Sequence, residues 1–405
     1  MIRRLTEYFD LRTFLMAITL VGIGLVSVYS ATFDARASEF FYRQAVWALL
    51  GLAAMLFVSF LPLRVLHMVA VPAYVLSMVL LISVLLIGRT VSGSTSWFNF
   101  GQMRFQPSEL AKVTTALMLA SYLSRSDVSL RQVRDLTIGA GIVLLPVALI
   151  MLQPDTGTGL LFLGMVLPVL YWGGASRSTI VTILAPGAAA VAALFGTTPF
   201  LVAVAVFGVL IYLTREQRLV AAAAFSVMVL VGISVQSIYD GLKPYQQKRI
   251  AAFLDPTVDP LGAGYNIVQS KVAIGSGGLF GKGYLQGTQT QLNFIPEQWT
   301  DFIYCVPGEE FGFVGAAAVL LLFAGLIFRG VSLATMVKNQ FLSILGIGLT
   351  GFLFVHVVIN IGMALGLLPV IGVPLPFLSY GGSSLLASMT MVGLFMNLYA
   401  NRKEY

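Results

Sequence analysis

Cysteine, histidine and charged residues are all scarce in this chain, and each scarcity excludes a class of protein. The single cysteine, Cys305, rules out a disulfide within the chain and any cysteine-rich metal site. The two histidines, His67 and His356, lie far apart in the sequence and form no metal-binding motif. Only 10% of the 405 residues are charged. Ordinary soluble domains have roughly 25%, so the composition excludes a soluble protein.

Apolar residues make up 58% of the sequence and gather in long runs, which indicates a polytopic membrane protein. The formal net charge of +7 would suggest a nucleic acid partner if the protein were soluble. In a membrane protein it is better explained by cations that stay on the cytoplasmic side, so no nucleic acid is expected. The first run follows Arg3 and Arg4 and is too long for a cleavable signal peptide. It is therefore predicted to be a spanning helix.

Twelve apolar runs are candidates for membrane-spanning helices. They lie near 13–32, 44–62, 69–88, 109–124, 137–152, 157–173, 178–195, 199–213, 218–236, 303–328, 340–366 and 378–400. The expected fold is an all-α helix bundle of about 10–12 transmembrane helices in a single membrane domain, 1–405. Several runs are shorter than the roughly 20 residues that a spanning helix needs, so one pair can be re-entrant. The pair at 178–213 is the first candidate.

The positive-inside rule predicts the orientation of the bundle. An even number of helices leaves both termini on one side, and the basic residues near both ends of the chain place that side in the cytoplasm. A large polar segment, about 237–302, then forms an extracytoplasmic loop. This loop carries several cations: Lys243, Lys248, Arg249, Lys271 and Lys282. Because the rule constrains long loops only weakly, these cations call for another explanation.

The stretch 93–112 carries the first polar cluster, GSTSWFNFGQMRFQPSELAK. Its motif Pro107-Ser108-Glu109 predicts a helix start, with Ser108 as the N-cap and the acid in the positive first turn. Lys112 lies at i+3 from Glu109, so both side chains share one face of the predicted helix. A charge at membrane depth costs about 3 kcal/mol on insertion scales. The pair is therefore interpreted as functional, with helix capping as the alternative for Glu109.

Two further polar stretches interrupt the apolar runs. Asp155, in 153–158, is either the cap of the next helix or a functional acid, and the sequence weights the two equally. The segment 367–386 is rich in proline and glycine, and such irregular backbone at membrane depth must be surrounded by protein or a water-filled cavity. His356 and Asn360, at i and i+4 on the preceding helix, are predicted to hydrogen-bond between helices rather than to bind a ligand.

The segment 253–315 is unlike the rest of the chain, because it is dense in glycine, carboxylates, lysines and amides. A membrane protein with such a segment is expected to use it for recognition or chemistry. Its charged residues include Asp255, Asp259, Lys271, Lys282, Glu297, Asp301, Glu309 and Glu310. The glycine-rich run 274–278 between the two lysines can cradle a diphosphate, although glycine-rich loops are common. Acids and cations outside an apolar bundle suit a substrate with a lipid tail, a diphosphate and a polar head.

Five blocks of sequence carry a resemblance to a known family. They are QPSELAK, GAGYNIVQSKVAIGSGGLFGKG, GTQTQLNFIPEQWTDF, GEEFGFVG and GLLPVIGVPLPFLSYGGSS. In this order, over nearly the whole chain, they resemble the SEDS (shape, elongation, division and sporulation) family. Within that family the blocks are most similar to the RodA branch, and FtsW is the sibling branch.

The resemblance implies a peptidoglycan glycosyltransferase that polymerises lipid II at the outer face of the bacterial cytoplasmic membrane. It also implies two kinds of partner, a class B penicillin-binding protein that crosslinks the product and the membrane proteins of the elongation complex. The essential acid of the family lies in a Leu-Asp-Pro context in the large outer loop, which is Asp255 here. A carboxylate there can act as general base for the attacking sugar hydroxyl.

The reaction also has to stabilise a departing undecaprenyl diphosphate. Cations or a divalent metal, Mg or Mn, would do so, although no cofactor is certain. The predicted diphosphate partners are Arg104, Lys112, Lys271 and Lys282, with Ser276 in the glycine-rich run. Glu109, Glu297 and Asp301 are predicted to position Lys112, a sugar or a metal. Ser379 and Tyr380 belong to the broken segment 374–384, which is predicted to line the cavity.

The chain departs from the family pattern in three places. An extra apolar helix pair is expected within 174–236. An arginine that relatives carry before the QPSE block is missing from Gly93-Ser94-Thr95-Ser96-Trp97. Trp299 stands where relatives have histidine, which argues against that histidine as an obligatory proton carrier.

Three alternatives to an elongation polymerase stay open. A lipid II flippase or transporter also has intramembrane charges and broken helices, although no inverted repeat is visible. The second alternative is a division-specific polymerase of the FtsW type. The third is a scaffold without catalytic activity, for which Asp255→Asn would leave cell shape intact.

Overall fold

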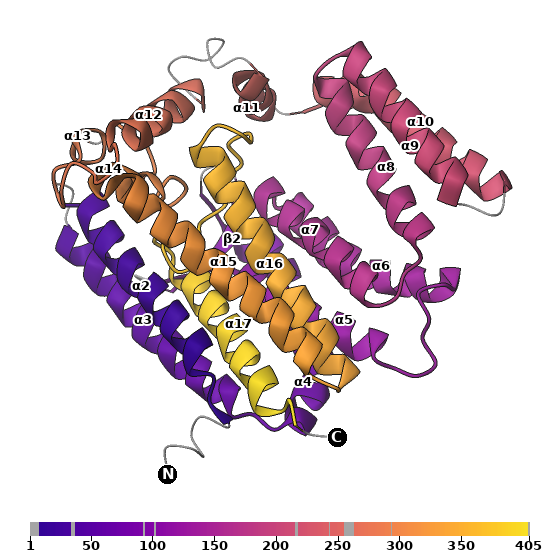
Figure 1. The fold of residues 1–405 in the computed structure, drawn as a ribbon, viewed down its shortest axis with the longest axis horizontal. Helices are drawn as coiled ribbons and strands as arrows, with labels where there is room; N and C mark the ends of the chain where they lie inside the picture. Colours follow the sequence, from indigo (N-terminus) through magenta and orange to yellow (C-terminus); the bar gives the residue numbers. More distant parts are fainter. Residues whose placement is uncertain are drawn as a thin grey trace.

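The structure, a computed structural model, shows a large helical bundle with a smaller group of helices to one side (Figure 1). It describes residues 8–33, 37–91, 94–100, 103–214, 218–242, 244–254, 263–292 and 294–403. Both ends of the described chain lie at the same end of the bundle, as Figure 1 shows.

Twelve helices correspond to the twelve apolar runs. They are α2 (Leu11–Ala31), α3 (Ala37–Ser59), α4 (Leu63–Ile87), α5 (Pro107–Leu123), α6 (Val133–Leu152), α7 (Thr156–Trp172), α8 (Arg177–Leu194), α9 (Thr197–Thr214), α10 (Arg218–Asp240), α15 (Gly312–Met336), α16 (Gln340–Ala364) and α17 (Gly382–Ala400). Within the described part of the chain, ten helices are long and apolar enough to span a membrane. The helices α5 and α7 have 17 residues each. The prediction of an all-α, multi-pass membrane protein is confirmed.

The core of the bundle lies around α16 and α17, most of whose residues are buried. α17 packs along α3, α16 packs along α7 and α15, and α5 packs against both α4 and α16. The helices α8, α9 and α10 pack mainly on one another around a small core of their own, centred on Ala185, Ile211 and Met228. In Figure 1 they stand beside the main bundle and are joined to it through α7. Their outward faces are apolar and exposed, as lipid-facing helices require.

A small antiparallel sheet, which the sequence did not predict, precedes α5. Its strands are β1 (Arg89–Val91), β2 (Ser94–Phe100) and β3 (Met103–Phe105), in the order β1-β2-β3. Phe98 pairs with Phe105 and Asn99 with Arg104. The hydroxyl of Ser94 donates to the carbonyl of Gln153 at 2.7 Å, which ties the sheet to the turn before α7.

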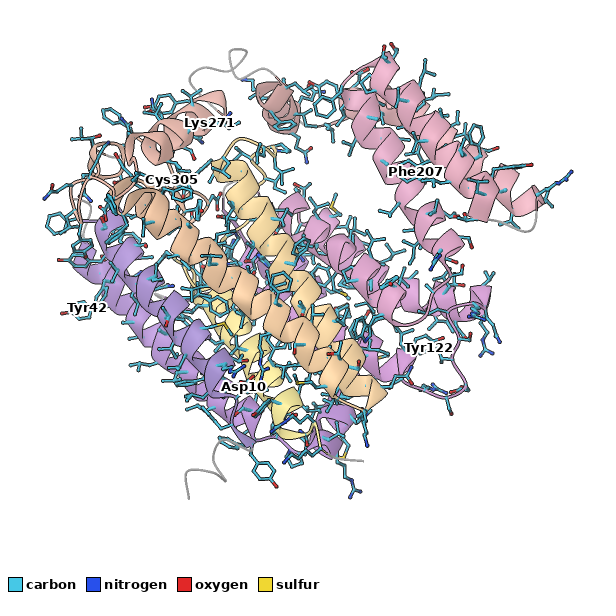
Figure 2. The ribbon with its side chains drawn as sticks, viewed as in Figure 1. Asp10, Tyr42, Tyr122, Phe207, Lys271 and Cys305 are labelled. Atoms are coloured by element: carbon cyan, nitrogen blue, oxygen red, sulfur yellow. The ribbon has the colours of Figure 1, made fainter. Side chains whose placement is uncertain are left out.

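Four shorter helices occupy the polar segment before α15. They are α11 (Pro244–Leu254), α12 (Ala263–Ser276), α13 (Thr288–Gln291) and α14 (Cys305–Glu310). Figure 2 shows Lys271 on α12 and Cys305 on α14 at one end of the molecule, with Asp10 at the other. The apolar run predicted to begin at 303 is divided between α14 and α15. Gly312, with φ of +64°, follows the break and adopts a backbone conformation that side chains disfavour. These four helices therefore lie at the end of the bundle opposite both chain ends.

Candidate functional site

A buried ion pair lies at the start of α5. The side chains of Glu109 and Lys112 are almost fully buried, and the Lys112 Nζ lies 2.7 Å from the Glu109 Oε2. The predicted sharing of one helix face is confirmed. The predicted N-cap was wrong, because Gln106 holds that position and Ser108 lies inside the helix. Proline at the first helical position, with its fixed φ, begins the helix two residues earlier than a cap at Ser108 would.

The ion pair is joined to the opposite helix through His356 on α16. The Lys112 Nζ lies 2.9 Å from the His356 Nε2, and the His356 Nδ1 lies 3.2 Å from the carbonyl oxygen of Pro374. One turn further along, Asn360 donates to the carbonyls of Val373 (2.7 Å) and Asp301 (2.8 Å). The predicted hydrogen bond between helices is therefore confirmed for His356, which contacts Lys112 of α5. For Asn360 the prediction was wrong in its partners, because both carbonyls belong to segments that are not helical.

The broken segment before α17 is held by side chains rather than by helical hydrogen bonds. The Ser379 hydroxyl accepts from the backbone N–H of Leu375 at 2.7 Å and donates to the carbonyl of Thr300 at 2.6 Å. From α3, the Gln44 amide donates to the Ser379 carbonyl and accepts from the N–H of Gly381. These bonds satisfy backbone groups that a helix would otherwise pair internally.

The predicted residues Glu297, Asp301 and Tyr380 lie where the outer segment, the polar segment that carries α11 to α14, meets this broken segment. The backbone N–H of Tyr380 donates to the Trp299 carbonyl at 2.8 Å, and both rings flank Phe40 of α3, with centroid distances of 5.1 and 5.9 Å. Asp301 is half-buried, and its carboxylate lies near Gly372. The Glu297 side chain is exposed and accepts from the Thr300 hydroxyl at 3.2 Å. The structure thus brings together predicted residues that lie about 80 positions apart in the chain.

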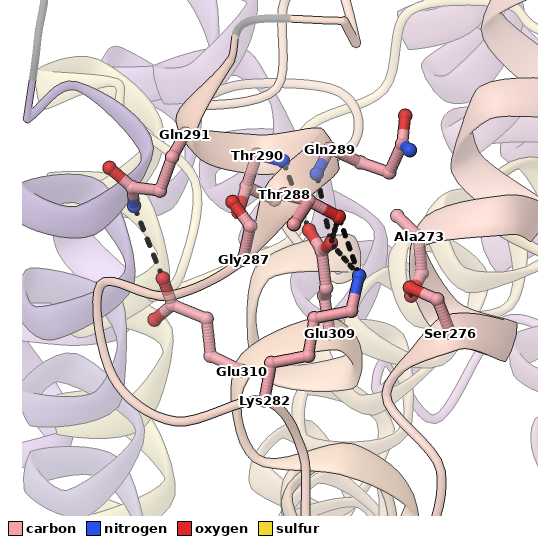
Figure 3. Close-up of polar contacts among 10 residues, drawn as sticks. All are labelled: Ala273, Ser276, Lys282, Gly287, Thr288, Gln289, Thr290, Gln291, Glu309 and Glu310. Atoms are coloured by element: carbon pink, nitrogen blue, oxygen red, sulfur yellow. Dashed lines mark hydrogen bonds and ion pairs between the residues drawn. The ribbon is translucent and has the colours of Figure 1, made fainter.

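Lys282 is placed in a different cluster, at α14 (Figure 3). Its Nζ lies 2.7 Å from the fully buried carboxylate of Glu309 and donates to the Thr288 hydroxyl. The same carboxylate accepts from the backbone N–H groups of Gln289 (2.9 Å) and Thr290 (3.0 Å). Burial raises the pKa of Glu309, but these hydrogen bonds and the ammonium outweigh it and leave the pKa below its usual value.

The neighbouring Glu310 has a weaker set of partners. Its Oε1 accepts from the Ser30 hydroxyl of α2, from the Gln291 amide at 3.2 Å and from the N–H of Leu285 at 3.2 Å. Its Oε2 is buried and makes no hydrogen bond within the described structure. Burial is the largest effect and leaves the pKa of Glu310 above its usual value.

The remaining predicted polar partners have exposed side chains. Lys271 on α12 lies against the backbone at the end of α16, where a Cβ on Gly366 would be 2.6 Å from its Nζ. Arg104 on β3 is exposed, and its carbonyl accepts from the Ser383 hydroxyl at 3.2 Å. Ser276 is exposed at the end of α12 and bonds back to the carbonyl of Ala273. Of these cations, Lys271 lies beside the end of α16.

Asp155 caps α7. Its carboxylate accepts from the backbone N–H of Thr158 at 3.0 Å and from the Thr158 hydroxyl at 2.8 Å. It also accepts from the Gln106 amide at 3.0 Å, which links the start of α7 to the start of α5. The capping alternative for Asp155 is therefore confirmed.

Asp255, the predicted general base, and Asp259 lie outside the described residues, so their predicted roles stay predictions. Among the residues that are described, no three histidine, cysteine, aspartate or glutamate side chains come together to hold a metal ion. The Mg or Mn expectation also stays a prediction.

Sequence reasoning missed Gln44, and it gave His356 and Glu309 no role in the candidate site. Gln44, His356 and Glu309 each contact predicted residues from a distant part of the chain. The only available signal was the polar character of each side chain at membrane depth or beside it.

The comparisons with known proteins agree over most of the chain. The family model described as cell cycle protein, FtsW/RodA/SpoVE, matches residues 11–200 and 195–404. Peptidoglycan glycosyltransferase MrdB of Escherichia coli is 38% identical over 87% of this chain and 84% of its own. Peptidoglycan glycosyltransferase RodA of Treponema pallidum is 34% identical over 97% of this chain and 98% of its own.

Solved structures give the same result. A chain from a peptidoglycan synthase complex, described as coordinating polymerization and crosslinking, superposes with a TM-score of 0.74 at 31% identity. It covers 98% of this chain and 99% of its own. The crystal structure of the rod shape determining protein RodA of Thermus thermophilus gives a TM-score of 0.65 at 28% identity, with 98% of both chains covered. The chain therefore belongs to the FtsW/RodA/SpoVE family of cell cycle proteins, which is the SEDS family.

Proposed function

We propose that this protein is a peptidoglycan glycosyltransferase that polymerises lipid II into glycan strands for cell elongation and rod shape. The observation that carries the proposal is the match over 84–98% of the length of relatives named peptidoglycan glycosyltransferases. The family match over residues 11–200 and 195–404 covers both the bundle and the polar segment before α15. Identities of 34–38% to the MrdB and RodA relatives, against 32% to FtsW relatives, favour elongation over division.

The proposed reaction needs a general base for the attacking hydroxyl and positive charge near the leaving diphosphate. The C4 hydroxyl of one sugar attacks the anomeric carbon of another, and the bond to the undecaprenyl diphosphate breaks with its electron pair leaving on the diphosphate. Asp255 takes the hydroxyl proton as general base. Positive charge near the leaving group lowers the barrier, because negative charge develops there in the transition state. A divalent cation, if one is bound, would supply the same stabilisation.

The predicted cations differ in how they can contribute. Lys271 and Arg104 have exposed side chains and can approach a diphosphate directly. Lys112 and Lys282 each form an ion pair with a buried carboxylate, so their charge is already balanced in this conformation. Lys271 and Arg104 are therefore the first diphosphate partners to test.

The proposed setting is the bacterial cytoplasmic membrane with both termini in the cytoplasm. The two ends of the described chain lie together, opposite the segment from α11 to α14 (Figure 1), and the basic residues near the ends favour the cytoplasmic side. The outer segment then faces lipid II after its transfer across the membrane. The proposed partners are a class B penicillin-binding transpeptidase, by analogy with the synthase complex that this chain resembles, and the membrane proteins of the elongation complex.

The test is polymerisation of labelled lipid II by purified protein, alone and with its transpeptidase partner, read as a ladder on a gel. Wild-type protein is expected to give a ladder that Asp255→Asn abolishes, while the variant keeps its thermal stability. A ladder that persists in Asp255→Asn would remove Asp255 from the chemistry. If neither protein gives a ladder and lipid II instead crosses the bilayer of liposomes, the protein is a flippase.

A further inference from the structure

His356 has two hydrogen-bonding partners with opposite requirements. The Lys112 ammonium can only donate, and it lies 2.9 Å from Nε2; the Pro374 carbonyl can only accept, and it lies 3.2 Å from Nδ1. Both contacts are satisfied together only when Nδ1 carries the hydrogen and Nε2 carries the lone pair. The two partners therefore assign a neutral imidazole in the Nδ1–H tautomer.

The Lys112 side chain is fixed by this ring on one contact and by Glu109 on another. A lysine carries a point charge on a flexible stem, so a single ion pair leaves the position of its ammonium poorly defined. Two short contacts, 2.7 Å to Glu109 and 2.9 Å to His356, restrict it to one place between α5 and α16. Lys112 and His356 are both at least 97% buried, so water does not compete for these contacts.

The other side of the ring reaches the broken segment. Pro374 follows Val373, whose carbonyl is held by Asn360, and the same Asn360 amide holds the carbonyl of Asp301. His356 and Asn360 therefore present their hydrogen-bonding groups on one face of α16. Together their contacts fix the Lys112 ammonium and the carboxylate-bearing outer segment relative to each other.

We propose that His356 is a positioning residue for glycosyl transfer: it holds the Lys112 ammonium through Nε2 and ties that ammonium, through Nδ1–H, to the broken segment. The kinetic consequence of this inference rests on the proposed polymerase function. The placement of Lys112 does not, and each can be tested separately.

The placement is tested by ¹⁵N solid-state NMR of the full chain in liposomes, labelled at histidine. Because the chain has only two histidines, His67→Gln leaves His356 as the single labelled ring. The expected spectrum shows a protonated Nδ1 and an unprotonated, hydrogen-bonded Nε2. The Nε2 resonance is expected to shift in Lys112→Met and to stay in place in Lys271→Met, whose lysine lies on α12. An imidazolium, the Nε2–H tautomer, or an Nε2 resonance unaffected by Lys112→Met would overturn the proposal.

The kinetic consequence is tested with two variants of similar volume. His356→Gln keeps a carbonyl that can accept from Lys112 and an N–H that can donate to Pro374, whereas His356→Leu keeps neither. We expect kcat for lipid II polymerisation to fall on the order of 10- to 100-fold in the leucine variant, with KM little changed and activity largely restored by glutamine. Equal activity of the two variants at equal thermal stability would contradict a positioning role.

The NMR experiment and the kinetic experiment distinguish failure of the proposed function from failure of the proposed role of His356. If the wild-type protein gives no polymer, the proposed function fails, and the spectrum alone decides the placement of Lys112. If the leucine variant does not fold, the glutamine variant and the wild-type spectrum still decide the proposal, because neither depends on it.

Discussion

The ammonium of Lys282 lies 2.7 Å from the carboxylate of Glu309 (Figure 3), and the Glu309 side chain is fully buried. Lys282 was predicted from the sequence to bind a diphosphate. In the structure it completes a set of donors to Glu309 that includes the N–H groups of Gln289 and Thr290, and its predicted diphosphate contact stays a prediction. The carboxylate thereby joins α13 to α14 and to the turn that carries Lys282.

Glu309→Gln is expected to lower the thermal stability of the protein. The neutral amide cannot pair with Lys282, and it offers one oxygen where the carboxylate offers two. Hydrogen bonds to a charged group contribute about 1.5–3 kcal/mol each, so the loss is expected to exceed about 2 kcal/mol. The measurement is the melting temperature of purified protein in detergent, with Lys282→Met beside it.

The matched control is Glu310→Gln, one residue further along. The Glu310 Oε1 accepts three hydrogen bonds from neutral donors, and a glutamine oxygen can accept the same three. We therefore expect a smaller loss than for Glu309→Gln. Equal losses of stability for the two variants would show that the donors around Glu309 contribute no more to stability than those around Glu310.

The two glutamates are expected to respond to pH in opposite directions. The folded pKa of Glu309 is lowered, so its contribution is present above the unfolded pKa of about 4.3 and is lost as pH falls through the folded pKa. The folded pKa of Glu310 is raised, so its contribution is present below about 4.3 and is lost as pH rises through the folded pKa. Melting temperatures of the wild type and both glutamine variants from about pH 4 to about pH 7 test this. The deficit of Glu309→Gln should grow with pH, and that of Glu310→Gln should shrink.

Lys271→Met is expected to weaken polymerisation without affecting the fold. The Lys271 side chain is exposed and lies against the backbone of Gly366, so its removal leaves no buried group without a partner. If it contacts the diphosphate of lipid II, KM for lipid II rises while the melting temperature stays within about one degree of the wild type, as for most surface substitutions. Unchanged kinetics would remove Lys271 from the site.

Asp155→Asn is expected to leave polymerisation intact. Asparagine caps a helix about as well as aspartate, so the bond to the N–H of Thr158 can be kept. Asp155→Ala should instead destabilise the protein by about 0.5–2 kcal/mol. Loss of polymer with the asparagine variant, at a normal melting temperature, would give Asp155 a chemical role beyond the cap.

The spanning helices could be predicted from the sequence because the signal is local. A run of apolar residues in lipid can satisfy its backbone hydrogen bonds within its own segment only as a helix, whatever the rest of the chain does. The sheet at β1–β3 was missed because its strands are short and lie between glycines and apolar runs without a regular alternation. Ser108 was misassigned as a cap because the proline at the first helical position places the helix start two residues earlier.

The site was only partly predictable, because its contacts join distant residues. Glu109 and Lys112 could be paired from their spacing alone. Their third partner, His356, lies 244 positions from Lys112, and no local pattern indicates such a contact. Glu309 was noted only as an acid near the membrane, since the N–H groups that hold it belong to the short helix α13, whose position the sequence does not reveal.

The tight contact between α3 and α17 gives a last prediction, about the end of the broken segment. A Cβ built on Gly382, the first residue of α17, would lie 2.1 Å from the Cε2 of Trp47. Gly382→Ala must therefore move the Trp47 ring or the start of α17, and overpacking of this kind costs about 1–3 kcal/mol. The same shift would disturb Gly381, whose N–H is held by Gln44.

A double-mutant cycle separates this clash from a general effect of alanine. Trp47→Leu removes the ring, so Gly382→Ala should cost less in that background than in the wild type. Gly22→Ala on α2 is the control, because a Cβ added there would meet no atom within 4 Å and alanine favours a helix by up to about 1 kcal/mol. Melting temperatures of the four proteins of the cycle and of the control give the coupling. Additive losses would show that the ring does not pack on Gly382, whereas coupling would mean that α3 fixes where the broken segment ends.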